Sequence, residues 1–237
     1  MTYIIGDVHG EFDCLRRLVE KLPEESKLIF VGDLVDRGRK SKEVVEFVKN
    51  NNFLCVLGNH EKMMIEYVDE FEKTYPNLPC MIYYHRWIHN GGKQTLLSYK
   101  VIEVDKSDGK LVCLEDKEKF QRLLDDVKWL KTLPLFIELE FKKNDKPIVI
   151  SHASMADVWY LKDDVKKQET IEEYALWNRK EPKIDVPIFN IFGHTIQKEV
   201  ELTKHFIDVD TGCCYADKGY GKLSAYCIET NQIIFTK

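Results

Sequence analysis

The 237-residue sequence contains no apolar run near the ~20 residues that a membrane-crossing helix needs, so neither a transmembrane segment nor a membrane partner is expected. Its first residues lack the basic region and cleavage site of a secretory signal. The chain also lacks excess positive charge: 35 Lys and Arg stand against 40 Asp and Glu, a net charge of -5. Without a basic footprint, no nucleic-acid partner is expected. These absences predict a cytoplasmic protein.

Cysteine pairs of the C-x-x-C type are also missing, although the chain has seven cysteines. An odd number without such pairs excludes zinc-finger spacing and a disulfide framework, so we expect reduced thiols that pack as small apolar residues. Internal repeats, low-complexity tracts and linkers are absent as well. The length suffices to bury a sizeable core, and a single domain over residues 1–237 is predicted.

The first sixty residues alternate between short apolar segments and amphipathic segments. The apolar segments are typical of buried strands and comprise residues 2–5, 27–31 and 53–57. Apolar residues recur at helical spacing over 12–22 and 44–48, and a further helix is expected over 61–73. This alternation predicts a parallel sheet with right-handed crossovers.

The predicted secondary structure of the rest of the chain changes at about residue 62 and again at residue 135. Residues from about 62 to 134 predict a helical and irregular, cap-like region, with a hairpin over 101–104 and 111–114 and a helix over 120–130. From residue 135 onward strands dominate, at 135–141, 147–153, 188–195, 205–212, 223–229 and 233–236. The predicted class is α/β (α+β), with two mixed β-sheets packed face to face and flanked by helices.

Polar side chains follow directly on five of the predicted strands. The segments are GDVHG (6–10), GDLVDRG (32–38), GNHE (58–61), SHA (151–153) and GHT (193–195). Ligands of open α/β sheets bind outside the carboxyl ends of strands, so these loops can converge on one crevice.

The residue types in these loops indicate a metal site. Asp7 and His9, two residues apart, share one face of an extended chain with Cα atoms ~7 Å apart, so both can reach one ion. Oxygen and nitrogen ligands without sulfur favour manganese, iron, zinc or nickel over calcium. Six candidate ligands are too many for one tetrahedral ion: Asp7, His9, Asp33, Asn59, His152 and His194. They fit two divalent ions ~3.5–4 Å apart that share a carboxylate, as in two-metal phosphoester hydrolases.

Two ions would leave net positive charge after the ligand carboxylates and a bridging hydroxide are counted, and Arg37 adds to it. Such a pocket suits a phosphate dianion, for which arginine is the bidentate partner. His60 lies beside the candidate ligand Asn59, and Asp36 is placed to hold its imidazole in one tautomer. An imidazolium there would protonate a leaving alkoxide as a general acid.

The five motifs in this order resemble the phosphoprotein phosphatase family of calcineurin-like metallophosphoesterases, from residue 3 to about 212. Further segments are similar to its bacterial and bacteriophage lambda-type branch: Met63-Met64, Asn90-Gly91-Gly92, Leu133-Pro134, Trp177-Asn178-Arg179 and Asp210-Thr211-Gly212. The longer C-terminal motif of the eukaryotic branch is absent. Segment 98–118 adds strand-like sequence, so the resemblance does not predict the part of the pocket wall that this segment would form.

The resemblance implies a β-sandwich with a dinuclear site, usually supported by manganese. It places Asp7, His9 and Asp33 on one ion. It places four residues on the other: Asp33, Asn59, His152 and His194. Arg37 and Arg179 would hold the phosphate, with His60 as the acid and Asp36 as its partner. Arg179 rests on the resemblance alone.

The predicted function is a metal-dependent phosphomonoesterase, a serine/threonine protein phosphatase that attacks a phosphoprotein or phosphopeptide with a hydroxide bridging two metal ions. A symmetrical bis(5'-nucleosyl)-tetraphosphatase, acting on a dinucleoside polyphosphate, is the alternative, since it shares GDVHG and GNH. Its pattern has a small apolar residue and an Asp where this chain has Asp36 and Glu61, which favours the protein phosphatase. An inactive metal-binding scaffold is a weaker alternative, because no ligand is missing.

The four tryptophans, including Trp87, are interpreted as packing residues because no basic patch surrounds them.

Overall fold

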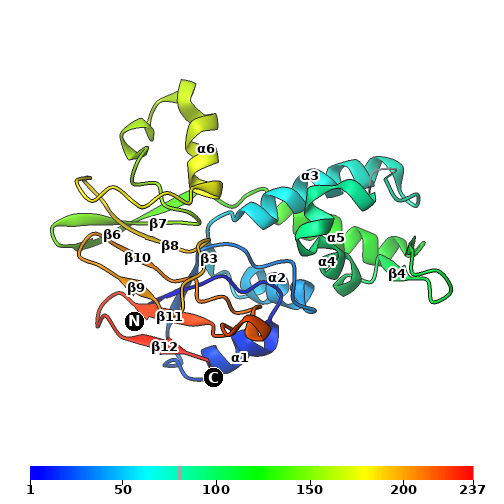
Figure 1. Ribbon diagram of the computed structural model, residues 1–237, viewed down its shortest axis with the longest axis horizontal. Coiled ribbons are helices and arrows are strands. Elements are labelled where there is room, and N and C mark those ends of the chain that lie inside the picture. Colours follow the sequence, from blue (N-terminus) through cyan, green and yellow to red (C-terminus); the bar gives the residue numbers. More distant parts are fainter. Residues whose placement is uncertain (80–81, 237) are drawn as a thin grey trace.

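Two five-stranded sheets lie face to face in the computed structural model, which describes residues 1–79 and 82–236 (Figure 1). The first sheet has the order β12-β11-β1-β2-β3. Its strands are β1 (Thr2–Ile5), β2 (Lys27–Phe30), β3 (Leu54–Cys55), β11 (Ser224–Cys227) and β12 (Ile233–Phe235). The β1, β2 and β3 strands are parallel, as their alternation with helices predicted, and β11 joins β1 antiparallel.

The second sheet has the order β6-β7-β8-β10-β9. Its strands are β6 (Phe136–Lys143), β7 (Lys146–Ser151), β8 (Phe189–Phe192), β9 (Glu201–Leu202) and β10 (Phe206–Asp208). Here β7, β8 and β10 are parallel, whereas β6 and β9 pair antiparallel at the two edges. Both sheets are therefore mixed, as predicted.

Side chains on β1 alternate between the two faces of the first sheet. Ile4 belongs to an apolar layer with Ile150 and Ile191 of the second sheet, whereas Tyr3 and Ile5 belong to the cluster on the outer face. All four residues of β1 are buried, because one face meets the other sheet and the opposite face meets helices. The predicted face-to-face packing is thus confirmed.

Helices cover the outer faces. Helices α1 (Phe12–Val19) and α2 (Ser41–Asn50) bury apolar residues in the cluster on the first sheet. Helix α6 (Gln168–Trp177) packs Ile171 and Ala175 against Val149 of the second sheet. None of the helices in the described part of the chain has the length and apolar character required to cross a bilayer.

The region from about 62 to 134 projects from one end of the sandwich (Figure 1). It contains most of α3 (Asn59–Thr74), then α4 (Lys93–Ser98), the predicted hairpin β4 (Ile102–Val104) and β5 (Leu111–Cys113), and α5 (Lys117–Leu130). Two short turns, η1 (Ile82–Tyr84) and η2 (Ile88–Gly92), connect α3 to α4.

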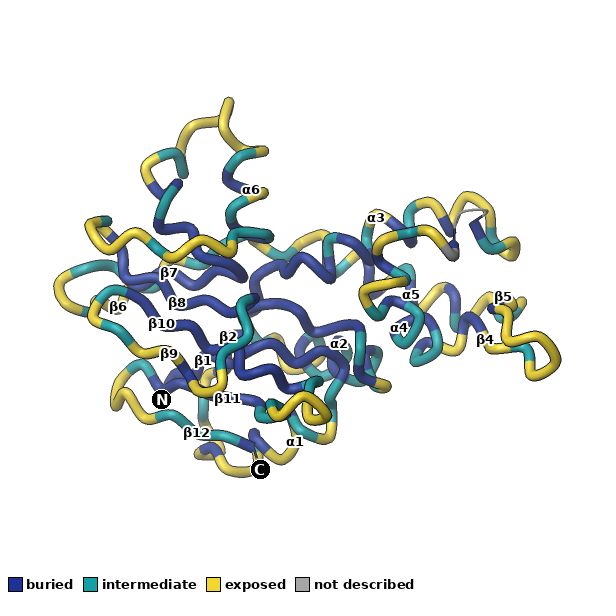
Figure 2. The backbone as a smooth tube through the Cα atoms, in the orientation of Figure 1, coloured by how far each residue is buried: buried dark blue, intermediate teal, exposed yellow. Residues whose placement is uncertain are grey.

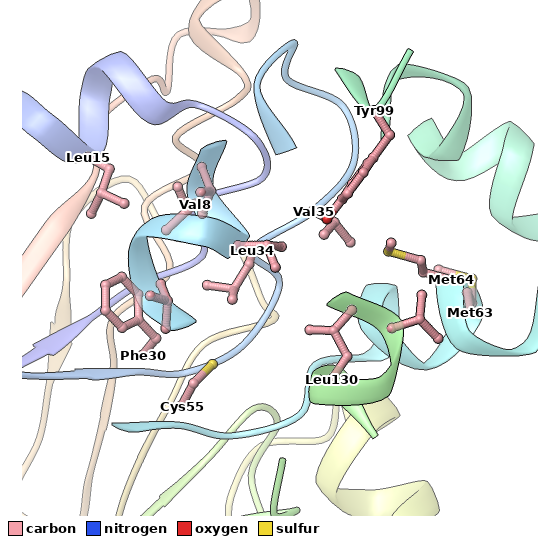
Figure 3. Packing of buried hydrophobic residues seen from close by; sticks show 14 of the residues in the cluster. Val8, Leu15, Phe30, Leu34, Val35, Cys55, Met63, Met64, Tyr99 and Leu130 are labelled. Atoms are coloured by element: carbon pink, nitrogen blue, oxygen red, sulfur yellow. The ribbon is translucent and has the colours of Figure 1, made fainter. Parts of the chain in front are cut away.

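The core of this region is continuous with that of the sandwich. Figure 3 shows Met63, Met64 and Leu130 in the same cluster as Leu34 and Val35, which follow β2. Figure 2 shows the buried backbone running through the strands into the start of α3, with exposed chain at the outer loops. This continuity supports the proposal of a single domain.

Several predicted boundaries were wrong. Helix α3 begins at Asn59, two residues before the predicted start, so Asn59 and His60 lie in its first turn. Most strands are shorter than predicted because the chain turns at the glycines and polar residues that follow them; β3 has two residues rather than five. Helix α6 and strand β9 were not predicted. Six cysteines are free thiols, and the prediction for Cys80 lies outside the described residues.

Candidate metal and acid-base site

The side chains predicted as metal ligands come together where β1, β2, β3, β7 and β8 end. All six are at most 5% exposed: Asp7, His9, Asp33, Asn59, His152 and His194. Neighbouring contacts link every one of them into a single group, although they are spread over nearly 190 residues of the chain. The parallel topology explains this convergence, since parallel strands end at the same edge of a sheet.

Asp33 lies at the centre of the group. One of its oxygens is 3.4 Å from His9 Nε2 and 3.9 Å from His60 Nε2, while the other is 3.4 Å from His152 Nε2. Two sets of donor atoms that could each hold a metal ion share this carboxylate: His9, Asp33 and His60, and Asp33, His152 and His194. Within each set the donor atoms lie within 4.8 Å of one another. Such an arrangement matches a carboxylate that bridges two ions.

The second set fits a cation most clearly. His152 Nε2 is 2.8 Å from Asn59 Oδ1 and 3.1 Å from His194 Nδ1. His194 Nε2 is buried and has no hydrogen-bond partner. A buried imidazole nitrogen without a partner is costly unless a ligand satisfies it, so these residues fit a metal ion.

Asp7 completes the group from β1. Its carboxylate accepts the backbone N–H of His194 at 3.2 Å. A Cβ atom at Gly193 would overlap Asp7 Oδ1, so only glycine permits this close approach. Burial raises the pKa of Asp7 well above its usual value, and the carboxylates of Asp210 and Asp33 raise it further.

Burial keeps the candidate histidine ligands neutral. It lowers the pKa of His9 and of His152, and together with His152 it lowers the pKa of His194 to about 2. His9 Nδ1 is 2.9 Å from the carbonyl oxygen of Val35, and His152 Nδ1 is 2.9 Å from that of Val31. These carbonyls accept the Nδ1 proton and leave Nε2 with its lone pair, the state that a metal ligand needs.

The charge balance points the same way. Six carboxyl groups around the site are at most 3% exposed: Asp7, Asp33, Asp36, Glu61, Asp208 and Asp210. The guanidinium groups of Arg37 and Arg179 act on one of them, Asp210, and oppose the rise of its pKa. Buried carboxylates require cations or many hydrogen bonds, so the acidic excess also fits divalent ions. Asp210 belongs to the segment Asp210-Thr211-Gly212 that resembles the family, but neither Asp210 nor Asp208 was predicted as a site residue, since no spacing connects them to the other loops.

The backbone is strained at the same place. Ten non-glycine residues of the described chain have positive φ, and five belong to this site: His9, Asp33, Asp36, Arg37 and His194. Left-handed backbone costs about 1–3 kcal/mol per residue and persists where the surroundings enforce it, often at functional sites. The concentration at strand ends therefore marks this edge of the sandwich as functional.

His60 and Asp36 form the predicted pair. His60 Nδ1 is 2.5 Å from Asp36 Oδ2, and Asp36 is completely buried. Burial lowers the pKa of His60, but the carboxylates of Asp33 and Asp36 outweigh it, so the net shift is upward. The pair therefore favours a charged, oriented imidazole.

The indole of Trp87 and the hydroxyl of Thr95 also contact Asp36. Trp87 Nε1 donates to both carboxylate oxygens, and Thr95 Oγ1 donates to one of them. Neither contact was predicted: Trp87 was interpreted only as a packing residue. No motif carries these contacts, which depend on how the chain folds back after α3.

The hydrogen bonds of Glu61 with the backbone were also not predicted. Its carboxylate accepts four backbone N–H groups, from Asp33, Leu34, Val35 and Gly58. It therefore ties the loop after β2 to the start of α3 and holds Asp33 near Asn59.

The two arginines lie at the mouth of the site. Arg37 Nη1 is 2.6 Å from His9 Nε2, and Nη2 is 3.0 Å from His60 Nε2. Its guanidinium also lies 5.1 Å from the centre of the Tyr215 ring. Arg179, which is exposed, donates to the carbonyl oxygen of His194 at 3.1 Å. Both predicted arginines are thus placed beside candidate metal ligands.

The family model for calcineurin-like phosphoesterases matches residues 2–198 of this chain. Serine/threonine-protein phosphatase 2 of Escherichia coli is 28% identical over 240 residues, covering 96% of this chain and 92% of that protein. A symmetrical bis(5'-nucleosyl)-tetraphosphatase of Actinobacillus pleuropneumoniae is 26% identical over 226 residues, covering 92% of this chain and 70% of that protein.

Solved structures agree on the fold. A putative diadenosine tetraphosphatase matches with a TM-score of 0.62 at 20% identity, covering 99% of this chain and 92% of that one. A cold-active protein tyrosine phosphatase matches with a TM-score of 0.58 at 16% identity, covering 99% of this chain and 75% of that one. At such identities the likeness shows the sandwich architecture alone.

Proposed function

Because the chain belongs to the calcineurin-like phosphoesterase family and is a phosphoric ester hydrolase, we propose that it is a serine/threonine protein phosphatase supported by two divalent metal ions. Asp7, His9 and Asp33 would hold one ion. Four residues would hold the other: Asp33, Asn59, His152 and His194. When bound, the ions would supply positive charge for the phosphate and activate water as the nucleophile.

The observation that carries the proposal is the His60–Asp36 contact of 2.5 Å beside the candidate ligands. A serine or threonine alkoxide is a poor leaving group and needs a proton as the P–O bond breaks. His60 would donate this proton from Nε2, because Asp36 occupies Nδ1 and favours the imidazolium. A nucleotide leaving group needs such an acid less.

His60 is also within reach of Asp33 and counts among the donors of the first set. We assign it as the acid because Asp36 holds its Nδ1 and its Nε2 faces Arg37, a residue suited to phosphate. In the first set we assign Asp7, rather than His60, as the third ligand beside His9 and Asp33. The buried carboxylate of Asp7 lacks a cationic partner among the described residues and is repelled by Asp33 and Asp210.

Arg37 and Arg179 would hold the non-bridging phosphate oxygens. In this structure Arg37 lies against His9 Nε2, the nitrogen that the proposal gives to a metal ion. Because a guanidinium can only donate, Arg37 would turn from both His9 Nε2 and His60 Nε2 toward the phosphate when the ions bind, which leaves His60 Nε2 free to carry the proton. The adjacent Tyr215 ring offers its guanidinium a second contact outside the metal-ligand group.

A cavity of about 540 Å³ beside Arg37 has room for the part of the substrate that surrounds the phosphate. Lys93, Gln94 and Tyr215 line it together with η2, and no carboxylate lies in the lining. The cavity is open and cationic, which suits an extended, acidic peptide segment around a phosphoserine or phosphothreonine.

The test compares substrates under one condition. With manganese present, we expect the protein to release phosphate from a phosphoserine or phosphothreonine peptide with a higher kcat/KM than from diadenosine tetraphosphate. Two metal ions per chain are expected by elemental analysis, with activity restored to chelated protein by manganese in preference to iron, zinc or nickel. Faster cleavage of diadenosine tetraphosphate to ADP would overturn the protein-phosphatase proposal and leave the ester-hydrolase assignment intact.

The alternative substrate is a dinucleoside tetraphosphate, which the name of the A. pleuropneumoniae relative favours. The two relatives named above differ by only two percentage points in identity, 28% and 26%, so similarity does not separate them. The substrate comparison therefore decides between them.

A further inference from the structure

Asp36 is surrounded by more hydrogen-bond donors than its role as a partner of His60 requires. Its Oδ2 atom lies 2.5 Å from His60 Nδ1 and accepts from Trp87 Nε1 at 2.8 Å. Its Oδ1 atom accepts from the same Trp87 nitrogen at 2.9 Å and from Thr95 Oγ1 at 2.6 Å. Three side chains thus contact one buried carboxylate, which they hold in a single orientation.

Both added donors come from one segment far along the chain. Trp87 is completely buried immediately before η2, and Thr95 is completely buried in α4. The Asp36 backbone N–H donates to Thr95 Oγ1 at 3.0 Å, so the threonine hydroxyl contacts both the main chain and the carboxylate of Asp36. The segment therefore forms hydrogen bonds with both the carboxylate and the backbone N–H of Asp36.

The position of the Trp87 ring is itself constrained. A Cβ atom on Gly92 would overlap the indole, so only a glycine at this position lets the chain pass over the ring. On another side, the ring centre of Tyr67 in α3 lies 5.0 Å from that of Trp87. The indole is thus held between α3 and η2 with its N–H directed at the carboxylate.

We propose that Trp87 and Thr95 are positioning residues for the general acid, and that they act through Asp36. This inference rests on the proposed function of His60. By fixing the rotation of the Asp36 carboxylate they keep the His60 imidazole aligned, so that its Nε2 faces the oxygen of the departing alcohol. General-acid catalysis requires this alignment, since proton transfer occurs only within hydrogen-bond reach of the leaving group.

A residue that only packs the core would affect all substrates alike, whereas a residue that aligns the acid affects substrates that need the acid. The test uses Trp87→Phe, which keeps an aromatic side chain but removes the indole N–H, and Thr95→Val, which keeps the shape and removes the hydroxyl. Trp129→Phe, at a partly buried tryptophan of the same apolar cluster, is the matched control. Thr95→Ser, which retains the hydroxyl, is the rescue variant.

For a phosphoserine peptide we expect each test variant to lower kcat at least ~10-fold, part of the ~10²–10⁴-fold that a general acid supplies. For p-nitrophenyl phosphate, whose leaving group needs little protonation, we expect less than a ~3-fold change. KM, bound manganese per chain, and the kinetics of the Trp129→Phe and Thr95→Ser variants should stay near those of the parent protein. Equal losses on both esters, or loss of bound manganese, would overturn the proposal.

A second readout does not depend on turnover. In metal-free protein, the His60 Nδ1–H proton shared with Asp36 should give a low-field NMR signal that Asp36→Asn abolishes. We expect Trp87→Phe to broaden or shift this signal and Trp129→Phe to leave it unchanged. An unchanged signal in Trp87→Phe would contradict the positioning role. Parent protein that cleaves neither ester would instead contradict the proposed function, while the NMR comparison would still decide whether Trp87 positions His60.

Discussion

The candidate ligands and the candidate acid are assembled by different means. The ligands follow the ends of five strands in two sheets, so the register of parallel strands brings them together. The acid pair of His60 and Asp36 is completed by Trp87 and Thr95, which belong to the region that projects from the sandwich. The ligands therefore depend on sheet topology, whereas the orientation of the acid depends on helix packing.

The two parts also differ in how their buried charges are satisfied. Around Asp33 several imidazole groups face one carboxylate, and His194 Nε2 has no partner. Around Asp36 three donors meet the two carboxylate oxygens. The first arrangement leaves donor atoms that fit a cation, whereas the second satisfies its carboxylate with hydrogen bonds. Perturbing the first should thus change metal content, and perturbing the second should change only the chemistry.

The largest effect is expected for Asp33→Asn. Loss of the shared carboxylate should weaken or abolish the binding of both ions and lower kcat/KM at least ~10³-fold, about 4 kcal/mol of activation free energy. Elemental analysis and steady-state kinetics measure the two consequences, with exposed Asp163→Asn as the control. A variant that keeps one site fully occupied would show that Asp33 does not bridge.

A smaller loss, confined to catalysis, is expected for His60→Asn. Removing the acid should lower kcat ~10²–10⁴-fold for a phosphoserine peptide and leave the metal content unchanged. The matched control is His205→Asn, a partly buried histidine outside the site. A parallel loss of metal would mean that His60 is a ligand, and the distinction between the two parts of the site would fail.

Arg37→Ala should act on substrate binding. Because charged hydrogen bonds contribute about 1.5–3 kcal/mol, KM for a phosphopeptide should rise ~10- to 100-fold. Metal affinity should stay the same or increase, since the guanidinium no longer lies 2.6 Å from His9 Nε2. Isothermal titration with manganese measures this, and weaker metal binding would contradict the placement of Arg37 on the phosphate side.

The smallest expected effect is the release of protons on metal binding. In metal-free protein burial raises the pKa of Asp7, and it raises that of Asp210 to about 6. A raised carboxyl pKa favours the protonated form, whereas a cation favours the ionised form, so binding should release protons and tighten as pH rises. The histidines contribute little, because burial lowers their pKa and keeps them neutral.

Titrating manganese at about pH 6, near the pKa of Asp210, in buffers of different ionisation enthalpy measures this release. Heats that do not depend on the buffer would contradict it. Proton uptake on binding would also contradict it, because carboxyl groups and histidines alike release protons when they bind a cation.

Much of the fold could be predicted from local patterns in the amino-acid sequence. Alternation of buried strands with amphipathic helices predicted the parallel core of β1, β2 and β3, and the later strands predicted a second sheet. Boundaries were less accurate, since α3 begins at Asn59 and β3 is only two residues long. Helix α6 was missed because only Ile171, Ala175 and Leu176 of its ten residues are buried, which leaves a weak helical pattern of apolar residues.

Part of the site was equally readable. Glycine-flanked Asp, His and Asn residues after strands predicted six candidate ligands, and neighbouring contacts in the structure link these six. His60, Asp36 and Arg37 were found in the same motifs. Arg179 came from family resemblance alone, and the structure places it at the His194 carbonyl.

The sequence by itself determined which side chains stand at strand ends, because the turn that follows a strand is a local property of the chain and parallel strands share one edge. Only the tertiary structure decided what surrounds them: the indole of Trp87 on Asp36, the four backbone donors to Glu61 and the nearness of Asp210 to Asp7. These contacts join segments separated by up to 203 residues of the printed chain. The hydrogen bonds to Asp36 and Glu61 form because burying a polar group demands a partner, and which partner lies within reach depends on how helices and loops pack.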